Sequence, residues 1–287
     1  MDRLLERAWR QRRRIALVAL LSGLAWMVAT GGGDPLFLLG VMAASAVASA
    51  LWIGIMPAGR GMASGFALGF LLTAIVDATL LGLGTSGFYV MAIILGLVLG
   101  LFRSLIMVSL PLGKLTQAVS GRAAVAMPPA EALELLVNDE GAGDEPKWHP
   151  EVDRIERDQS EPTRVRLYMK SVAGEEAGIA DVTILEHVPG KRYRASVRNV
   201  GAGKDIDGGA VTHATFEAAP HPRGALITIS EENTLPAALI LAMWIDDAPG
   251  DYAARFAAIV EDRPDHSFFT ADHRFIEFWA RLLPAPE

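Results

Sequence analysis

The first part of the chain is a succession of long apolar runs separated by short polar turns. Four runs are free or nearly free of charged residues: 15–30, 36–56, 62–84 and 88–110. A helix needs about 20 apolar residues to cross a hydrocarbon core about 30 Å thick, and each run is close to that length. The pattern therefore predicts an all-α transmembrane four-helix bundle over 15–110, preceded by a short N-terminal segment, 1–14.

After residue 110 the pattern changes to alternation of apolar and polar residues, which is typical of half-buried strands. The short polar stretch 111–121 is interpreted as a linker. Strands are expected at 122–127, from 152, and at 164–169, 180–187, 192–200, 209–218 and 225–233, because turn residues such as VPGK and HPRG separate them at hairpin spacing. Helices are expected at 128–139, which begins with two prolines, and from 235 to about 262, with a break at Pro249–Gly250. This order predicts an α+β domain over 122–263, followed by a tail, 264–287.

The distribution of charge predicts the orientation of the chain in the membrane. Residues 1–110 contain eight arginines, six of them before residue 15, and four acids, whereas the rest of the chain has a net charge of −11. Basic residues flank the predicted cytoplasmic ends of the spans, and the turns 31–35 and 82–87 contain none. We therefore expect a multi-pass inner-membrane protein, of bacterial type, with a basic N-terminus and a C-terminal domain that both lie in the cytoplasm. An acidic C-terminal domain argues against a nucleic-acid partner.

Small residues recur every four positions on one side of two predicted spans. They are Gly61, Gly65, Gly69, Thr73 and Asp77 in the third span, and Gly96 and Gly100 in the fourth. Such faces let helix backbones approach closely, so we expect them to pack helices together.

Asp77 is the one acid in a run otherwise free of charge. An acid at the bilayer centre costs about 2.5–3.5 kcal/mol, so such a residue normally faces protein or water. Arg103 is not its expected partner, because helical rise places the two residues roughly 12–14 Å apart in depth. We favour an inter-helix hydrogen bond for Asp77, since the sequence has neither the internal repeat nor the broken helices common in transporters. Conduction of protons or ions through Asp77 is the alternative.

The sequence offers little catalytic chemistry. The absence of cysteine excludes disulfides, thiolate metal sites and cysteine nucleophiles. No HExxH motif, serine elbow or Gly-rich phosphate loop occurs, so we expect no metal, no cofactor and no catalytic residue, and we lean against an enzyme. Glu231 and Glu232 are adjacent on a predicted strand, and alternation points them to opposite faces of the sheet.

The C-terminal domain resembles the START-like superfamily, also called SRPBCC or polyketide cyclase/dehydrase. Members begin with a strand, then a proline-led helix that ends in Asp, then Trp-x-Pro before the second strand. Pro128, Asp139, Trp148 and Pro150 occupy those places here, and the resemblance covers about 122–262. It implies a helix-grip fold, in which a curved antiparallel sheet surrounds a long C-terminal helix and encloses a cavity for a lipid or other apolar molecule. It brings no universal catalytic residues.

From this resemblance we expect a membrane-anchored protein that binds a hydrophobic small molecule or lipid in a cytoplasmic cavity. The expected cavity lining, with ordinary core packing as the alternative, is Trp148, Tyr168, His187, His213, Phe216, Met243 and Trp244. The alternatives are an accessory or assembly subunit that contacts a membrane-complex partner or a second copy of itself, and a small transporter or channel that uses Asp77. The amphipathic stretch 270–283 is expected to contact the membrane, a partner or its own domain.

Overall fold

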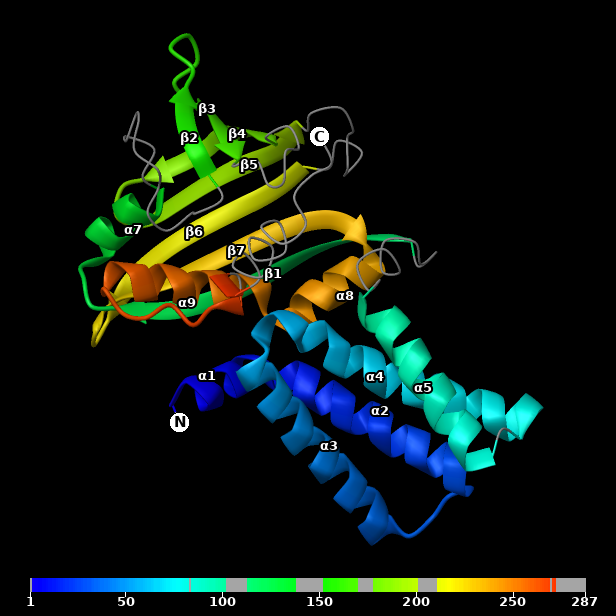
Figure 1. The fold of residues 1–287 in the computed structure, drawn as a ribbon. Coiled ribbons are helices and arrows are strands. Elements are labelled where there is room, and N and C mark those ends of the chain that lie inside the picture. The colour runs from blue at the N-terminus through cyan, green and yellow to red at the C-terminus, as the bar shows by residue number, and fades with distance from the viewer. Residues whose placement is uncertain are drawn as a thin grey trace, which may run out of the picture. The chain divides into compact units, whose positions relative to one another are not determined.

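In the computed structural model the chain forms two compact units, shown in Figure 1. The first, here called the helical unit, contains residues 1–112 and 241–246, and the second, the sheet unit, contains 113–240 and 247–287. The structure describes residues 2–82, 84–101, 113–137, 152–169, 178–200, 211–268 and 270–271.

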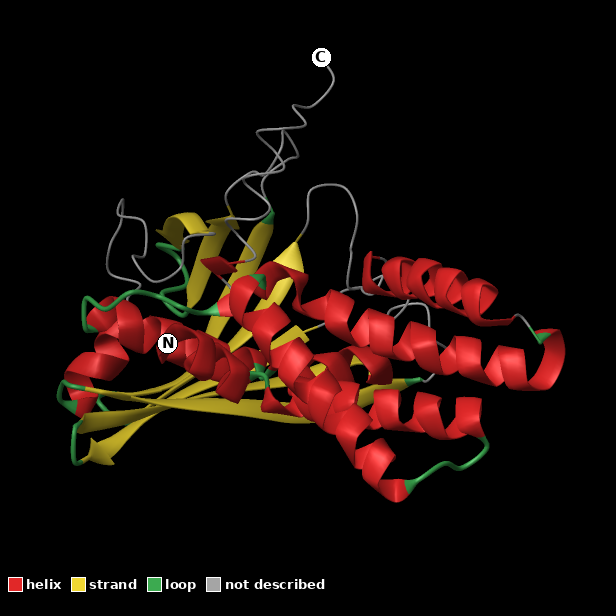
Figure 2. Ribbon diagram, turned by 60° about the horizontal axis from the view of Figure 1, so that its bottom comes forward, coloured by secondary structure: helices red, strands yellow, loops and turns green. Residues whose placement is uncertain are grey.

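The helical unit is built from helices that run alongside one another (Figure 2). They are α1 (Asp2–Arg10), α2 (Arg12–Thr30), α3 (Pro35–Ile55), α4 (Arg60–Val76) and α5 (Gly84–Leu101), with the 3-10 turn η1 (Pro57–Gly59) and the π-helical turn η2 (Asp77–Leu81). Helix α2 packs against α3 and α4, and α4 packs against α5. The turn between α2 and α3 is determined locally: Gly31 adopts the left-handed conformation that ends α2, and the Asp34 carboxylate accepts a hydrogen bond from the Leu36 N–H.

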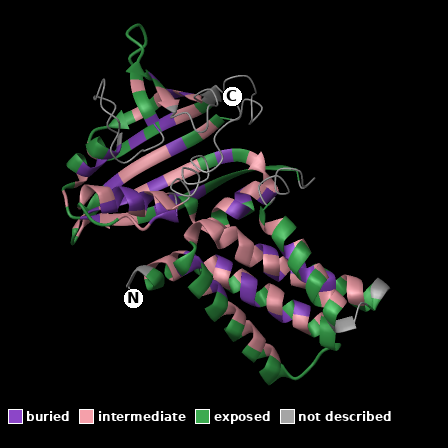
Figure 3. Ribbon diagram, viewed as in Figure 1, coloured by how far each residue is buried: buried purple, intermediate pink, exposed green. Residues whose placement is uncertain are grey.

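Three helical stretches are long and apolar enough to cross a membrane: Arg12–Thr30, Pro35–Ile55 and Pro57–Thr79. The apolar part of α5 that the structure describes, Ser86–Leu101, is shorter, so the fourth span remains a prediction. Many large apolar side chains of α3 and α5 are exposed, as Figure 3 shows by the green segments of these helices. Exposed apolar surface of this extent is typical of helices that contact lipid.

The sheet unit contains one seven-stranded antiparallel sheet. Its strands are β1 (Lys114–Val125), β2 (Val152–Arg157), β3 (Arg164–Met169), β4 (Ile179–Val188), β5 (Arg192–Val200), β6 (Val211–His221) and β7 (Gly224–Pro236). They lie in the order β1-β7-β6-β5-β4-β3-β2, so successive strands from β2 to β7 are neighbours and β1 closes the far edge beside β7. Hairpin connections of this kind explain why local alternation predicted the bounds of most strands to within two residues.

Strand β1 begins earlier than the sequence pattern indicated. Residues 114–121, which belong to the predicted linker 111–121, pair with β7 along their whole length, from Lys114 opposite Pro236 to Gly121 opposite Ile229. The pairing partner is more than 100 residues away, so no local signal marks this strand. Gly121 is required by a close approach: a Cβ atom there would clash with the backbone of Pro249 and Gly250.

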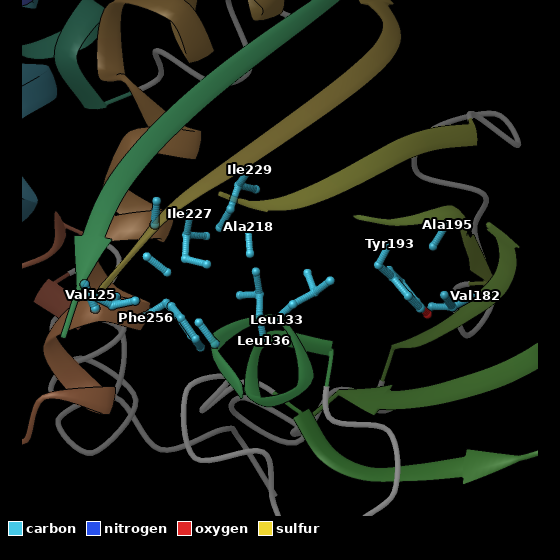
Figure 4. Close-up of a cluster of buried hydrophobic side chains, with 14 of the residues drawn as sticks. Val125, Leu133, Leu136, Val182, Tyr193, Ala195, Ala218, Ile227, Ile229 and Phe256 are labelled. Carbon is cyan, nitrogen blue, oxygen red and sulfur yellow. The ribbon is translucent and has the colours of Figure 1, made fainter. Parts of the chain in front are cut away.

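One face of the sheet, here called the inner face, carries the hydrophobic core. Helices α7 (Pro129–Val137) and α9 (Ala248–Val260) pack against it. Figure 4 shows Leu133 and Leu136 of α7 directed toward Ala218, Ile227 and Ile229 of the sheet, with Phe256 of α9 beside them. These apolar side chains are at most 8% exposed, so both helices are held by burial rather than by their own propensity.

The C-terminal helix is divided, as expected, but at a different residue. Helix α8 (Ala237–Asp246) ends before Asp247, which adopts a left-handed conformation, and α9 begins at Ala248. Pro249 therefore lies in the first turn of α9, where its missing N–H costs nothing, and does not itself break the helix.

A seven-stranded antiparallel sheet followed by C-terminal helices fits the helix-grip fold that the resemblance implies. Several expectations lie outside the described residues: Asp139, Trp148 and Pro150 of the family pattern, Arg103, and the amphipathic stretch beyond residue 271.

Candidate ligand-binding site

The inner face can be followed row by row from the pairing of the strands. One row contains His187, Tyr193, Phe216 and Ile229, on β4 to β7. The next row contains Ile184, Ala195, Ala214, Glu231 and Val119. Every other member of the second row is apolar, and two are alanines, so a carboxyl group stands among small apolar neighbours on this face.

Glu231 belongs to a short chain of polar side chains. The Thr212 hydroxyl donates to Oδ1 of Asn233 at 2.5 Å, and the Asn233 side chain donates to the Glu231 carboxyl. Asn233 is 4% exposed. Each polar end of the Asn233 amide thus has a partner, and one of these two hydrogen bonds orients Glu231.

The environment of Glu231 favours its neutral form. Burial raises the pKa of Glu231, and the hydrogen bond from Asn233 opposes that rise only in part. A carboxyl whose pKa is raised by its site can donate as well as accept a hydrogen bond. Buried titratable groups on a concave or helix-covered face are functional candidates for this reason.

The neighbouring acid, Glu232, lies on the opposite face, as alternation along the strand predicted. It is directly opposite His213 of β6 and Ala118 of β1, and both Glu232 and His213 are exposed. His213 is therefore on the outer face, away from the expected cavity. The two glutamates do not form a carboxylate pair.

The structure brings two other predicted residues onto the inner face. The ring of Phe216 lies 6.1 Å from the ring of Tyr193, and the ring of His187 lies 5.7 Å from Tyr193 on its other side. Phe216 and Tyr193 belong to the hydrophobic core, whereas His187 is exposed at the end of the row.

Tyr168 is placed differently from our expectation. On β3 the residues directed to the core are Val165 and Leu167, so Tyr168 is directed to the outer face. There its hydroxyl donates to Glu156 at 2.7 Å, and the Arg154 guanidinium lies 4.0 Å from its ring centroid. Alternation alone would have excluded Tyr168 from the cavity once Val165 was assigned to the core.

Met243 and Trp244 are also placed differently, because residues 241–246 belong to the helical unit. The Arg13 guanidinium lies 4.5 Å from the Trp244 ring centroid and donates to the Trp244 carbonyl at 2.7 Å. Within the same unit Gln11 donates to the Asp246 carbonyl, and Arg14 forms an ion pair with the Asp246 carboxylate. These polar and cation–π contacts hold the segment in the helical unit, so it does not line the expected cavity.

The glycine faces of the third and fourth predicted spans meet within the chain. A Cβ atom on Gly65 would lie 2.6 Å from the Gly100 nitrogen, and one on Gly69 would lie 2.6 Å from the Gly96 nitrogen. Thr73, next on this face, is fully buried. Gly61, at the start of the same face, lies in the first turn of α4. Backbone-to-backbone packing of α4 and α5 therefore occupies these faces.

Asp77 lies at the end of α4, where the α-helix passes into the π-helical turn η2. Its side chain lines a groove in the helical unit, among apolar residues of α2, α3 and α5.

No group of three or more His, Cys, Asp or Glu side chains suitable for a metal ion occurs among the residues described. Reasoning from the sequence considered Glu231 only as half of a carboxylate pair. The i, i+2 spacing of Glu231 and Asn233 on one strand was the available signal, because it places both side chains on one face.

No protein-family model matches the chain, and no curated protein matches it. Several solved structures are similar to about half of it. The protein CV1439 from Chromobacterium violaceum has 21% sequence identity, covering 52% of this chain and 99% of its own, with a TM-score of 0.38. The protein Mll3558 from Rhizobium loti has 14% identity, covering 51% and 99%, with a TM-score of 0.39. Norcoclaurine synthase from Thalictrum flavum has 17% identity, covering 52% and 87%, with a TM-score of 0.39.

Proposed function

We propose that this protein is a membrane-anchored, START-like protein whose sheet unit binds an apolar small molecule or lipid on its inner face, on the cytoplasmic side. The observation that supports it is the Glu231 carboxyl, oriented by Asn233, in a row that is otherwise apolar. Such an arrangement suits an amphiphile: the apolar body contacts the alanine and aromatic rows, and one hydroxyl or amine hydrogen-bonds to the carboxyl. Anchoring in a bilayer would keep a membrane-derived ligand at high effective concentration.

The accessory-subunit alternative receives less support. It uses the glycine faces of two spans and the amphipathic tail, 270–283, to hold partner subunits. Helices α4 and α5 pack their glycine faces on each other. The tail beyond residue 271 lies outside the described residues, and it is the remaining surface of this alternative for a partner or a second copy.

The test uses the full-length protein purified in mild detergent. Native mass spectrometry and extraction of bound small molecules would measure ligand content in the wild type, Ala214→Leu and Thr215→Leu. Ala214 neighbours Glu231 on the inner face, whereas Thr215 is the next residue on β6 and points to the outer face. We expect about one apolar molecule per chain in the wild type and Thr215→Leu, and a loss of most of it in Ala214→Leu.

Circular dichroism would establish that Ala214→Leu retains the sheet. A wild type without a stoichiometric ligand, or equal ligand content in the two folded variants, would contradict the proposal.

A further inference from the structure

The helical unit contains a groove of about 790 Å³ that the function proposed for the sheet unit does not use. Residues of α2, α3, α4 and the start of α5, together with Asp77, line it. All of these elements belong to one compact unit. The groove follows the helices from Trp52 and Ala63 at one end to Ala29, Asp77 and Phe88 at the other.

The lining has the chemistry of a site for a hydrocarbon chain. Its middle is formed by small side chains, including Ala25, Ser45, Ala48 and Ala67, which leave room along α2. Asp77 is the one residue of the lining that belongs to the Asp, Glu, Lys or Arg types. The groove therefore has a long apolar part and one acidic end.

The depth of the acidic end matches a lipid headgroup. Asp77 is 17 residues beyond Arg60, the first residue of α4, which is about 25 Å along the helix axis. A hydrocarbon core is about 30 Å thick, so Asp77 lies near the interface opposite to the one at which α4 begins. Asp77 thus lies nearer to an interface than to the bilayer centre. The insertion cost of about 2.5–3.5 kcal/mol applies to an acid at the bilayer centre.

The volume of the groove distinguishes between the two kinds of occupant that a membrane supplies. A helix of about 20 residues, about 30 Å long and 10 Å across, occupies roughly 2,400 Å³, so a partner helix would lie mostly outside the groove. Small-molecule sites have volumes of about 300–1,000 Å³, a range that includes this groove. We propose that the groove binds one acyl chain of an aminophospholipid, with the ammonium of the headgroup beside the Asp77 carboxylate. By charge complementarity, the acidic end favours a zwitterionic headgroup that carries an ammonium over a purely anionic headgroup.

Photo-crosslinking in nanodiscs tests this proposal on the full-length chain. The two probes are phosphatidylethanolamine and phosphatidylglycerol, each with a diazirine in one acyl chain. We expect adducts on α2, α3 and α4 peptides that line the groove, with labelling about fivefold stronger for phosphatidylethanolamine, the ratio that about 1 kcal/mol of charge pairing gives. Asp77→Asn should abolish this preference and retain the chain labelling.

A groove-filling variant and its matched control identify the place of labelling. Ala48→Trp should reduce groove adducts severalfold, whereas Ala43→Trp, an exposed position on α3 outside the lining, should not. Labelling spread evenly over the outer helix faces, or unchanged in a folded Ala48→Trp, would overturn the groove site. Equal labelling by the two lipids in the wild type would overturn the headgroup assignment. The Ala214→Leu variant of the sheet unit should leave all of these results unchanged, so failure here is distinguishable from failure of the proposed function.

Discussion

The guanidinium of Arg14 and the carboxylate of Asp246 form a buried ion pair between the beginning of α2 and the end of α8, within the helical unit. The Arg14 side chain is 1% exposed. Its other nitrogens donate to the Gln11 side chain, the Arg60 carbonyl and the Ser64 hydroxyl. A charge buried to this extent is tolerable because it is paired with a carboxylate and because its Nε and Nη1 also donate hydrogen bonds.

Removal of one member of this pair should destabilise the protein strongly. Arg14→Met leaves the Asp246 carboxylate without its cation, and we expect a loss of about 3–5 kcal/mol, as for other broken buried pairs. Arg12→Met, at an exposed position of the same helix turn, should cost less than about 1 kcal/mol. Unfolding of the detergent-solubilised protein, followed by tryptophan fluorescence, measures both.

The double variant Arg14→Met/Asp246→Leu completes a cycle. The loss of stability in the double variant should be smaller than the sum of the losses in Arg14→Met and Asp246→Leu, because no charge is then left buried alone. Additive losses would mean that the two side chains do not act as a pair.

Packing of α4 on α5 should be sensitive to a single methyl group at Gly69. Its Cβ would lie 2.6 Å from a backbone nitrogen, which cannot move as a side chain would. We expect Gly69→Ala to lower stability by about 1–3 kcal/mol. Gly40→Ala is the control, because a Cβ at Gly40 of α3 has no neighbour within 4 Å and alanine favours the helix. Unfolding in mixed micelles, followed by far-ultraviolet circular dichroism, compares them, and equal stabilities would contradict the observed contact.

Stability of the sheet unit should depend on pH through Glu231. The ordinary pKa of the carboxyl is 4.5, and burial raises the pKa in the folded state. Above pH 4.5 the folded state then binds more protons than the unfolded state, so this contribution to stability is present at low pH and is lost as pH rises through the folded pKa. Glu231→Gln removes that loss and should gain stability relative to the wild type as pH increases from 4.5 toward neutrality.

Melting temperatures of the wild type and Glu231→Gln across this range test the sign. Glu232→Gln, on the outer face of the same strand, controls for removal of a negative charge. A wild-type protein that gains stability relative to Glu231→Gln with rising pH would refute the assignment.

Substitution of Phe216 and of Tyr168, both predicted to line one cavity, should have different effects on stability and ligand content. Phe216→Ala removes a ring that packs on Tyr193 in the core, so we expect a loss of about 3 kcal/mol and a lower ligand content. Tyr168→Phe removes only a hydroxyl from the outer face and should change stability by less than about 0.5 kcal/mol. Chemical unfolding and the ligand measurement described above examine both, and loss of ligand in Tyr168→Phe would show that the faces are wrongly assigned.

The candidate site was only partly predictable from the sequence. Alternation places Glu231 and Asn233 on one face and Glu232 on the other, which is a local property of an extended chain. That Thr212 completes the polar chain, and that Ala214 and Val119 flank the carboxyl, depends on the pairing of β7 with β6 and with β1. A shift of one residue in register would have put different side chains beside Glu231.

The sequence by itself determined the apolar helices, most strands and their hairpin order, because hydrophobic period and turn residues act over a few positions. Only the tertiary structure decided the rest. Residues 114–121 become a strand because distant β7 supplies their hydrogen bonds. Residues 241–246 lie beside the start of α2 because Arg14 pairs with the Asp246 carboxylate and Gln11 donates to the Asp246 carbonyl. Both outcomes depend on partners far away in sequence, whose positions no local pattern encodes.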